Sequence, residues 1–303
     1  MILGLVMLYV GSSLLVEGAA ATAIMFAVRP VIVGLTIVSL ATSAPELLVS
    51  LVAAMKGSGG ISLGNILGSN VINIALVLGI SAAIHPVVIK KQIVKVELPY
   101  MIFISLIFWV LCLDAAIGRI DGLILIGLLT VFLIYSVLLA KDKENGDPSK
   151  SAAGLNFLKY GFFIIAGIIM LSYGATFVVK EAIAIARQIG LSETFIGVSL
   201  VAFGTSLPEL AASAVAAVKG ESDISVGNVV GSNLFNICLV MGVVGLFNPM
   251  TLEKDLHYFQ FPFMIFMCVL LFFIAYVKHR ISKPMGYGLI SLFVIYIMVS
   301  YIK

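Results

Sequence analysis

Two fifty-residue stretches of this chain are half identical, and this duplication constrains its architecture more than any other feature. When the sequence is shifted by 163 positions (194 − 31), Val31–Ile80 aligns with Thr194–Val243 without a gap, and 25 of the 50 positions are identical. Chance does not produce such a match. The chain is therefore an internal duplication, and we expect its two halves to fold into the same arrangement of helices.

Apolar runs predict that these helices span a membrane. The chain is 61% hydrophobic and only 11% charged, whereas soluble domains carry about 25% charged residues. A membrane-spanning helix needs about 20 apolar residues. Ten runs of that order predict an all-α membrane protein with ten transmembrane helices, at 2–28, 30–55, 61–85, 98–117, 120–140, 156–186, 194–218, 224–247, 258–278 and 284–302.

A polar stretch divides these ten runs five and five. It reads AKDKENGDPSK from Ala140 to Lys150 and is too short to form a folded domain. We therefore expect a first five-helix repeat over 1–140, a linker over 141–155 and a second repeat over 156–303, all in one membrane domain. Because each repeat has an odd number of helices, the two repeats must cross the membrane in opposite directions, as inverted repeats.

The basic residues predict the orientation of the chain. Cytoplasmic loops are enriched in Lys and Arg, and the loops on the linker side hold twelve of the 18 such residues. We therefore expect a multi-pass protein of the plasma membrane with a cytoplasmic linker and both termini outside. The twelve residues are Arg29, Lys90, Lys91, Lys95, Lys141, Lys143, Lys150, Lys159, Lys219, Lys278, Arg280 and Lys283.

Composition also excludes several kinds of function. The net charge of +3 is spread over loops, which gives no reason to expect a nucleic-acid partner. The cysteines lie in apolar segments without paired spacing, so we expect small buried side chains and no disulfides. The histidines fall near segment ends, which removes zinc, haem and Ser–His chemistry from the membrane interior. These residues are Cys112, Cys238, Cys268, His85, His257 and His279.

Two polar strings lie where a membrane tolerates them worst. ATSAPE ends at Glu46, and its repeat equivalent GTSLPE ends at Glu209. Pro45 and Pro208 lack an N–H, so they interrupt their helices and free backbone carbonyls; in hydrocarbon, such carbonyls must find partners or line a cavity. Inverted repeats with interrupted helices are typical of secondary transporters, whose site lies near the midplane.

A second pair of strings adds a polar stripe to each half. In GNILGSNVIN and GNVVGSNLFN, polar residues spaced by four share one helix face: Asn65, Ser69 and Asn73, and their equivalents Asn228, Ser232 and Asn236. The accompanying G-x-x-x-G spacing, at Gly64 and Gly227 among others, allows close helix packing. Interhelical hydrogen bonding is the simpler explanation of isolated polar residues, but the duplication of every element disfavours it.

Carboxylate charge indicates the kind of ligand. Only Glu46, Glu209 and Glu17 lie clearly inside spans, and an intramembrane carboxylate is by default a functional residue. Glu46 and Glu209 are repeat equivalents and together carry −2, the charge that balances one Ca2+ or two Na+. Carboxylates, hydroxyls and freed carbonyls form an all-oxygen set, which suits such hard cations. Glu17 aligns with Lys180 and is interpreted as structural or interfacial.

These strings resemble the alpha repeats of the cation/calcium exchanger superfamily, specifically its sodium/calcium exchanger branch. ATSAPE and GTSLPE match the G-T-S-x-P-E motif, with Ala41 in place of glycine, and GNILGSNVINI and GNVVGSNLFNI match the second motif. The resemblance implies that Glu46 and Glu209 bind the cations directly. It also implies oxygen ligands from Thr42, Ser43, Thr205, Ser206, Ser69, Ser232, Asn73 and Asn236, and from the backbone carbonyls of Ser39 and Ala202.

The resemblance implies a Na+/Ca2+ antiporter that works by alternating access, without a cofactor and without enzymatic activity, in which a monomer suffices for transport. Potassium-dependent members resemble SNxFD, whereas this chain reads SNLFN with Asn236, which favours K+-independent exchange. Exchange is electrogenic if more Na+ charge than Ca2+ charge moves per cycle. H+-coupled or K+-dependent cation antiport and a channel stay open, while an intramembrane enzyme would need a base that these strings lack.

Overall fold

The computed structural model describes residues 1–138, 153–188, 202–252, 256 and 258–302. The first half contains α1 (Ile2–Met25), α2 (Pro30–Val33), η1 (Gly34–Val38), α3 (Ser39–Thr42), α4 (Ala44–Met55), α5 (Gly59–Ile72), η2 (Asn73–Val77), α6 (Leu78–Ile84), β1 (Val87–Val88), η3 (Ile93–Glu97), α7 (Leu98–Leu111), β2 (Ala116–Ile117) and α8 (Arg119–Leu138). The η segments are single turns of π-helix.

The second half repeats much of this order. It contains α9 (Ala153–Gln188), α11 (Ala202–Thr205), α12 (Leu207–Val218), α13 (Ser222–Phe235), η6 (Asn236–Val240), α14 (Met241–Phe247), β3 (Met250–Thr251), α15 (Gln260–Lys278), β4 (Arg280–Ile281) and α16 (Lys283–Ile302). Helix α9 begins at Ala153, inside the stretch expected to be linker. The remainder of that linker up to residue 152 lies outside the described residues.

The all-α membrane class is confirmed. Within the described residues, eight helices are long and apolar enough to span a membrane, or nine if the bent pair formed by Pro30–Thr42 and Ala44–Met55 is one span. The expected run at 194–218 lies partly outside the described residues, which contain only α11 and α12 from it. The tenth span therefore stays a prediction.

Proline and glycine set several helix ends. Pro30, Pro45 and Pro208 lie in the first turns of α2, α4 and α12, where a missing N–H costs no hydrogen bond. Gly57 (φ +76°) follows α4, and its repeat equivalent Gly220 (φ +80°) follows α12. Only glycine adopts this left-handed conformation without strain. The duplicated sequence therefore stops the two equivalent helices in the same way.

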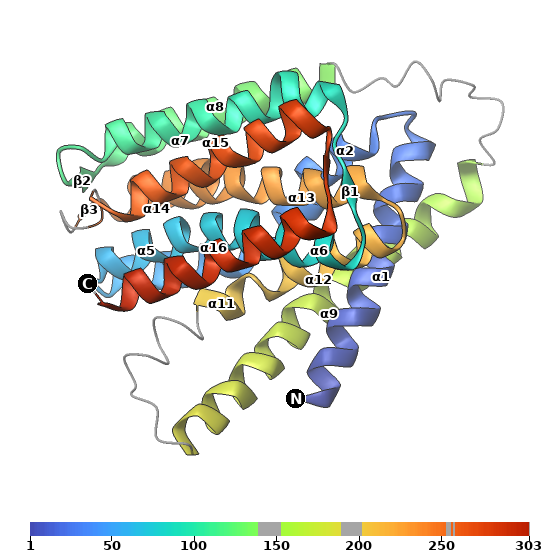
Figure 1. Ribbon diagram of the computed structural model, residues 1–303, viewed down its shortest axis with the longest axis horizontal. Coiled ribbons are helices and arrows are strands. Elements are labelled where there is room, and N and C mark those ends of the chain that lie inside the picture. Colours follow the sequence, from blue (N-terminus) through green and yellow to red (C-terminus); the bar gives the residue numbers. More distant parts are fainter. Residues whose placement is uncertain (139–152, 189–201, 253–255, 257, 303) are drawn as a thin grey trace.

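Two continuous spans form the centre of the bundle. Most residues of the spans Gly59–Ile84 (α5, η2 and α6) and Ser222–Phe247 (α13, η6 and α14) are buried, whereas fewer than half are buried in the other long spans. Each central span packs against the broken helix of the other half: α13 against η1 and α3, and α5 and α6 against α11 and α12. Figure 1 shows α1 and α9 side by side at one edge, inclined to the other long helices.

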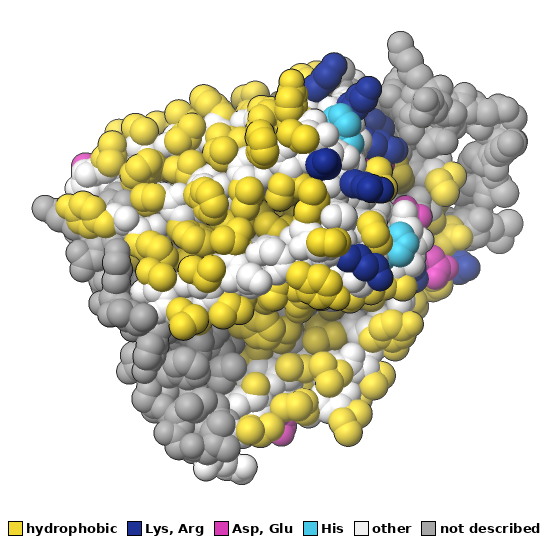
Figure 2. All heavy atoms as spheres, in the orientation of Figure 1, with side chains coloured by type: hydrophobic (Ala, Val, Ile, Leu, Met, Phe, Trp, Pro, Cys, Tyr) yellow, Lys and Arg dark blue, Asp and Glu magenta, His cyan; other side chains and the backbone are white. Residues whose placement is uncertain are grey.

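The surface fits a bilayer. Figure 2 shows apolar side chains over the length of the helices, with the Lys, Arg and His side chains gathered at the end where β1 lies in Figure 1. Lys90, Lys91, Lys278, Arg280 and Lys283 are exposed there. The three cysteines are buried and unpaired, as expected.

Four two-residue strands were not predicted. β1 pairs with β4, and β2 pairs with β3, both antiparallel. Each pair joins a loop of the first half to a loop of the second. Backbone groups that leave a helix still need partners, and these short pairings supply them across the two halves.

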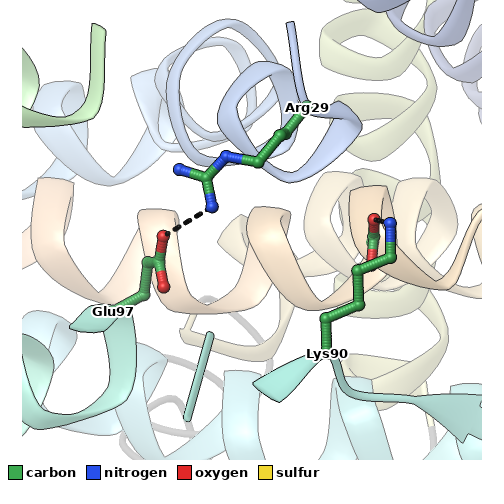
Figure 3. Close-up of polar contacts among 4 residues, drawn as sticks. Arg29, Lys90 and Glu97 are labelled. Atoms are coloured by element: carbon green, nitrogen blue, oxygen red, sulfur yellow. Dashed lines mark ion pairs between the residues drawn. The ribbon is translucent and has the colours of Figure 1, made fainter. Parts of the chain in front are cut away.

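Helix η3–α7 begins five residues before the expected start at 98, which places Glu97 inside a span. Counting apolar residues missed this helical turn because Lys95 and Glu97 interrupt the run. Glu97 is 2% exposed, and its Oε1 lies 3.7 Å from Nη1 of Arg29, whose side chain is 14% exposed. Lys90 forms a second ion pair, with Asp223 at 2.7 Å, but its side chain is 62% exposed. Figure 3 shows both pairs.

We expect these two ion pairs to differ in their effect on stability. Arg29→Ala leaves the Glu97 carboxylate buried without its partner, a change that costs about 3–5 kcal/mol. Lys90→Ala removes a solvent-exposed charge, which costs about 1 kcal/mol or less. Thermal unfolding in detergent should show a much larger fall in Tm for Arg29→Ala, and Arg29→Met with Glu97→Leu should recover most of it. Equal losses of Tm in the two single variants would contradict this assignment.

Candidate functional site

The string ATSAPE, which ends at Glu46, forms the break in a span. Helix α3 ends at Thr42, Ser43 adopts φ −82° and ψ 3°, and α4 starts at Ala44. The two segments on either side of Ser43 are bent by 44°. Pro45 explains the break, because it has no N–H to give the carbonyl four residues earlier.

The second string folds in the same way. Helix α11 ends at Thr205, Ser206 adopts φ −89° and ψ 5°, and α12 starts at Leu207 with Pro208 in its first turn. The equivalence in sequence is therefore an equivalence in local structure. It places Glu46 and Glu209 at the same position, in the first turn of a helix that begins inside the protein.

Both glutamates are fully buried, at 0% exposure. The N-terminal turn of a helix carries a partial positive charge, which stabilises a carboxylate near it. The C-terminal turns of α3 and α11 carry the opposite partial charge, and their last carbonyls lie at the same two breaks. At each break, one helix start stabilises a carboxylate and one helix end presents backbone carbonyls.

Each glutamate lies beside polar residues of the other half. Ser206 Oγ donates to Glu46 Oε1 at 3.4 Å and lies 3.4 Å from Ser69 Oγ. Thr42 and Ser43 of the first half lie beside Glu209. The two strings, 163 positions apart in the sequence, therefore form one site.

Asn65 and Asn228, from the strings GNILGSNVIN and GNVVGSNLFN, also form hydrogen bonds with the opposite half. Thr42 Oγ1 donates to Asn228 Oδ1 at 3.2 Å, and the equivalent Thr205 Oγ1 donates to Asn65 Oδ1 at 3.5 Å. Thr42 also lies 3.2 Å from Ser232 Oγ. Each threonine is thereby positioned by the central helix of the other half.

Two serines that we did not predict support these asparagines. Asn228 Nδ2 donates to Ser213 Oγ at 2.9 Å, and Asn65 Nδ2 donates to Ser50 Oγ at 3.0 Å. Both serines are fully buried. The sequence held a signal for them, because Ser50 and Ser213 are identical repeat equivalents four residues after Glu46 and Glu209.

Both glutamates and several of the other expected site residues have buried oxygen atoms without a hydrogen-bond partner. Within the part of the chain that the structure describes, no protein hydrogen bond reaches Glu46 Oε2, Glu209 Oε1 and Oε2, Ser43 Oγ, Asn73 Oδ1 or Asn236 Oδ1. Buried polar atoms are normally satisfied, and exceptions require an explanation such as an ion. The donor set is hydroxyl, amide and carboxylate oxygen, which suits hard cations. It contains no cluster of three His, Cys, Asp or Glu among the described residues.

Ser39 and Ala202 are the two residues expected to contribute backbone carbonyls. The Ser39 carbonyl accepts from the Ser43 N–H at 2.9 Å and lies 3.3 Å from Thr42 Oγ1. The Ser39 hydroxyl donates to the Gly34 carbonyl at 2.7 Å and lies 3.0 Å from the Asn228 carbonyl oxygen, which places it between η1 and α13. Ala202 is the first residue of α11, and its side chain lies outside the described part.

Close packing against glycine holds the central helix α13 at the break. A Cβ added to Gly231 would lie 2.7 Å from the Leu35 carbonyl oxygen and 2.8 Å from Leu35 Cα, and it would also meet Ser39 Oγ. Because two of these contacts are backbone atoms, rotation of a side chain cannot relieve them. A methyl group at Gly231 would therefore separate α13 from η1 and α3.

We expect Gly231→Ala to destabilise the protein by about 1–3 kcal/mol, the usual cost of overpacking, and to weaken cation-dependent function. Gly127→Ala in α8 is the control, because no described atom outside its own helix lies within 4 Å of the added Cβ. Tm in detergent, measured for both variants, tests the contact. A Gly231→Ala variant as stable as Gly127→Ala would show that the close approach is not needed.

Comparison with known proteins assigns the family. The family model described as sodium/calcium exchanger protein matches residues 1–138 and 159–302. An uncharacterized membrane protein of Methanocaldococcus jannaschii, MJ0091, is 35% identical over 97% of this chain and 94% of its own. The sodium/calcium exchanger MaX1 of Methanosarcina acetivorans is 29% identical over 99% and 97%. A solved structure of the sodium-calcium exchanger NCX_Mj, soaked with zero Na+ and Ca2+, matches with TM-score 0.87 and 33% identity over 98% and 96%.

Proposed function

This chain belongs to the sodium/calcium exchanger protein family, and we propose that it exchanges Na+ for Ca2+ across the cell membrane at one site shared by its two halves. The observation that carries the proposal is the pair of buried carboxylates, Glu46 and Glu209, with oxygen atoms that no described group satisfies. Two carboxylates in a low-dielectric interior are costly unless cations neutralise them.

The ligands that we propose for this site are those that the resemblance in sequence implies. Glu46 and Glu209 supply charge, and hydroxyl, amide and carbonyl oxygens from both halves complete the set: Ser39, Thr42, Ser43, Ser69, Asn73, Ala202, Thr205, Ser206, Ser232 and Asn236. The reciprocal contacts between Thr42 and Asn228, and between Thr205 and Asn65, support a site built equally by both repeats.

The proposal includes ten spanning helices arranged as inverted repeats, a cytoplasmic linker and both termini outside. Access to the site would alternate between the two sides as α1 and α9, which pack on each other at the edge of the bundle, move against the central helices. The coupling of Na+ and Ca2+ transport would follow from charge. The empty site would hold a charge of −2 in an apolar interior, so only the cation-loaded site would switch its access from one side of the membrane to the other. Each net charge moved per cycle is worth about 2.3 kcal/mol per 100 mV.

The direct test is 45Ca2+ uptake into proteoliposomes loaded with Na+ and diluted into Na+-free buffer. We expect uptake that requires the outward Na+ gradient. Glu46→Gln and Glu209→Gln should each abolish it, because one remaining carboxylate leaves buried Ca2+ uncompensated. Removal of one member of a buried charge pair costs about 3–5 kcal/mol, which corresponds to about 10²- to 4 × 10³-fold in affinity.

Glu17→Gln is the matched control, since Glu17 lies in the same kind of span but is exposed on α1; its uptake should equal that of the wild type. Uptake indifferent to Na+ and driven by a pH gradient would replace this proposal with proton-coupled transport. Uptake that persists without any counter-ion would indicate a channel. Undiminished uptake in both Gln variants would overturn the site.

Potassium should have no part in the exchange. An amide stands at Asn236, fully buried beside the unpartnered oxygens, and it adds no third carboxylate to balance another cation. Replacing K+ with choline on both sides of the vesicle should therefore leave Na+-driven 45Ca2+ uptake unchanged. A requirement for K+ would show that the site accepts a further cation and that the proposed ion set is incomplete.

A further inference from the structure

Four buried asparagines form a cluster where the two central spans meet. Asn70 lies near the end of α5, about one turn before Asn73, the first residue of η2. Asn233 and Asn236 are their repeat equivalents on α13 and η6. All four are at most 1% exposed. Asn73 and Asn236 belong to the proposed cation site, whereas Asn70 and Asn233 had no assigned role.

Asn70 and Asn233 hold each other across the two halves. Asn70 Nδ2 donates to the Asn233 backbone carbonyl at 3.4 Å, and Asn233 Nδ2 donates to the Asn70 backbone carbonyl at 3.3 Å. A carbonyl only accepts, so the NH2 end of each amide must face the other backbone. The same NH2 groups contact the sulfurs of Met264 at 3.6 Å and Met101 at 3.7 Å. The orientation of both amides is therefore fixed.

This orientation dictates that of the neighbouring pair. Asn236 Nδ2 donates to Asn70 Oδ1 at 3.1 Å, and Asn73 Nδ2 donates to Asn233 Oδ1 at 3.0 Å. If the amide of Asn236 or Asn73 turned over, its oxygen would face the side-chain oxygen of Asn70 or Asn233. Its NH2 group would then point to the side where its oxygen now lies. The oxygens of Asn73 and Asn236 are thus held on the opposite side, where no described group bonds them.

We infer that Asn70 and Asn233 are positioning residues that keep the amide oxygens of Asn73 and Asn236 turned toward the cations. The inference rests on the proposed cation site and deepens it. Each positioning residue acts on the other half, because Asn70 orients Asn236 and Asn233 orients Asn73. A cation needs oxygens, and an inverted amide would present positive N–H groups to it.

The reciprocal contacts also constrain the transport cycle. Sliding α5 against α13 by one turn would break both carbonyl contacts and release both ligand amides at once. The two central spans therefore move as one unit, and the change of access falls to the helices packed around them.

A double-mutant cycle tests the inference in Na+-driven 45Ca2+ uptake. Asn70→Leu frees the Asn236 amide to invert and should raise the Ca2+ concentration for half-maximal uptake about tenfold, within the range expected for a lost buried hydrogen bond. Asn236→Asp presents an oxygen to the cations in either orientation, but it also places an oxygen against Asn70 Oδ1, where the wild type has an N–H donor. In the Asn236→Asp background, Asn70→Leu removes this repulsion and has no amide to invert, so it should not raise the half-maximal concentration.

Met264→Leu is the matched control, because it removes the sulfur contact of Asn70 and leaves the amide pairs intact; it should behave as the wild type. A residue that only packs the helices would cost the same in both backgrounds, and equal fold-changes would overturn the inference. The mirror cycle, Asn233→Leu with Asn73→Asp, gives an independent second reading if Asn70→Leu fails to assemble.

Failure of the inference is distinguishable from failure of the proposed function. Absence of Na+-driven uptake in the wild type and in Met264→Leu would reject the exchange itself. Normal exchange in both proteins, combined with additive effects in both cycles, would leave the exchanger in place and remove only the positioning role of Asn70 and Asn233.

Discussion

Burial of two carboxylates at the centre of an apolar protein is the constraint on which this architecture depends. Glu46 and Glu209 have no exposed surface, and among the described residues most of their oxygens lack a hydrogen-bond partner. The N-terminal turns of α4 and α12 offset part of the free-energy cost of burying these charges. The Ser206 hydroxyl of the opposite half, which donates to Glu46, offsets a further part. Cations bound at the proposed site would neutralise the remaining charge.

The duplication turns this local constraint into a global fold. Each half supplies one carboxylate, and hydrogen bonds beside the carboxylates run across the interface between the halves, from Thr42 to Asn228 and from Thr205 to Asn65. The central spans interlock with the broken helices of the opposite half, and glycine at Gly231 permits the approach. The peripheral helices carry little of this network, which fits the proposed movement of α1 and α9 against the central spans.

Much of this could be predicted from the sequence, because apolar runs locate spans and a proline inside a run locates a break. The start of η3–α7 could not be predicted, because Lys95 and Glu97 interrupt the apolar pattern. The ion pair of Glu97 with Arg29, which stabilises Glu97 inside the protein, is a tertiary contact that the local sequence does not reveal. Ser50 and Ser213 were missed although they are repeat equivalents, because each stands as a single serine outside the two polar strings. Asn70 and Asn233 were missed because they lie off the stripe spaced by four, and the π-helical turns that begin at Asn73 and Asn236 alter the helix face.

The central claim is that Na+ and Ca2+ occupy the same two-carboxylate site in alternation. Equilibrium binding of 45Ca2+ to the purified protein in detergent, titrated with Na+, tests it most directly. The account predicts one bound Ca2+ per chain, displaced completely by Na+ with a sigmoidal dependence, because more than one Na+ is needed to replace the charge. Ca2+ binding that is unaffected by saturating Na+ would contradict it.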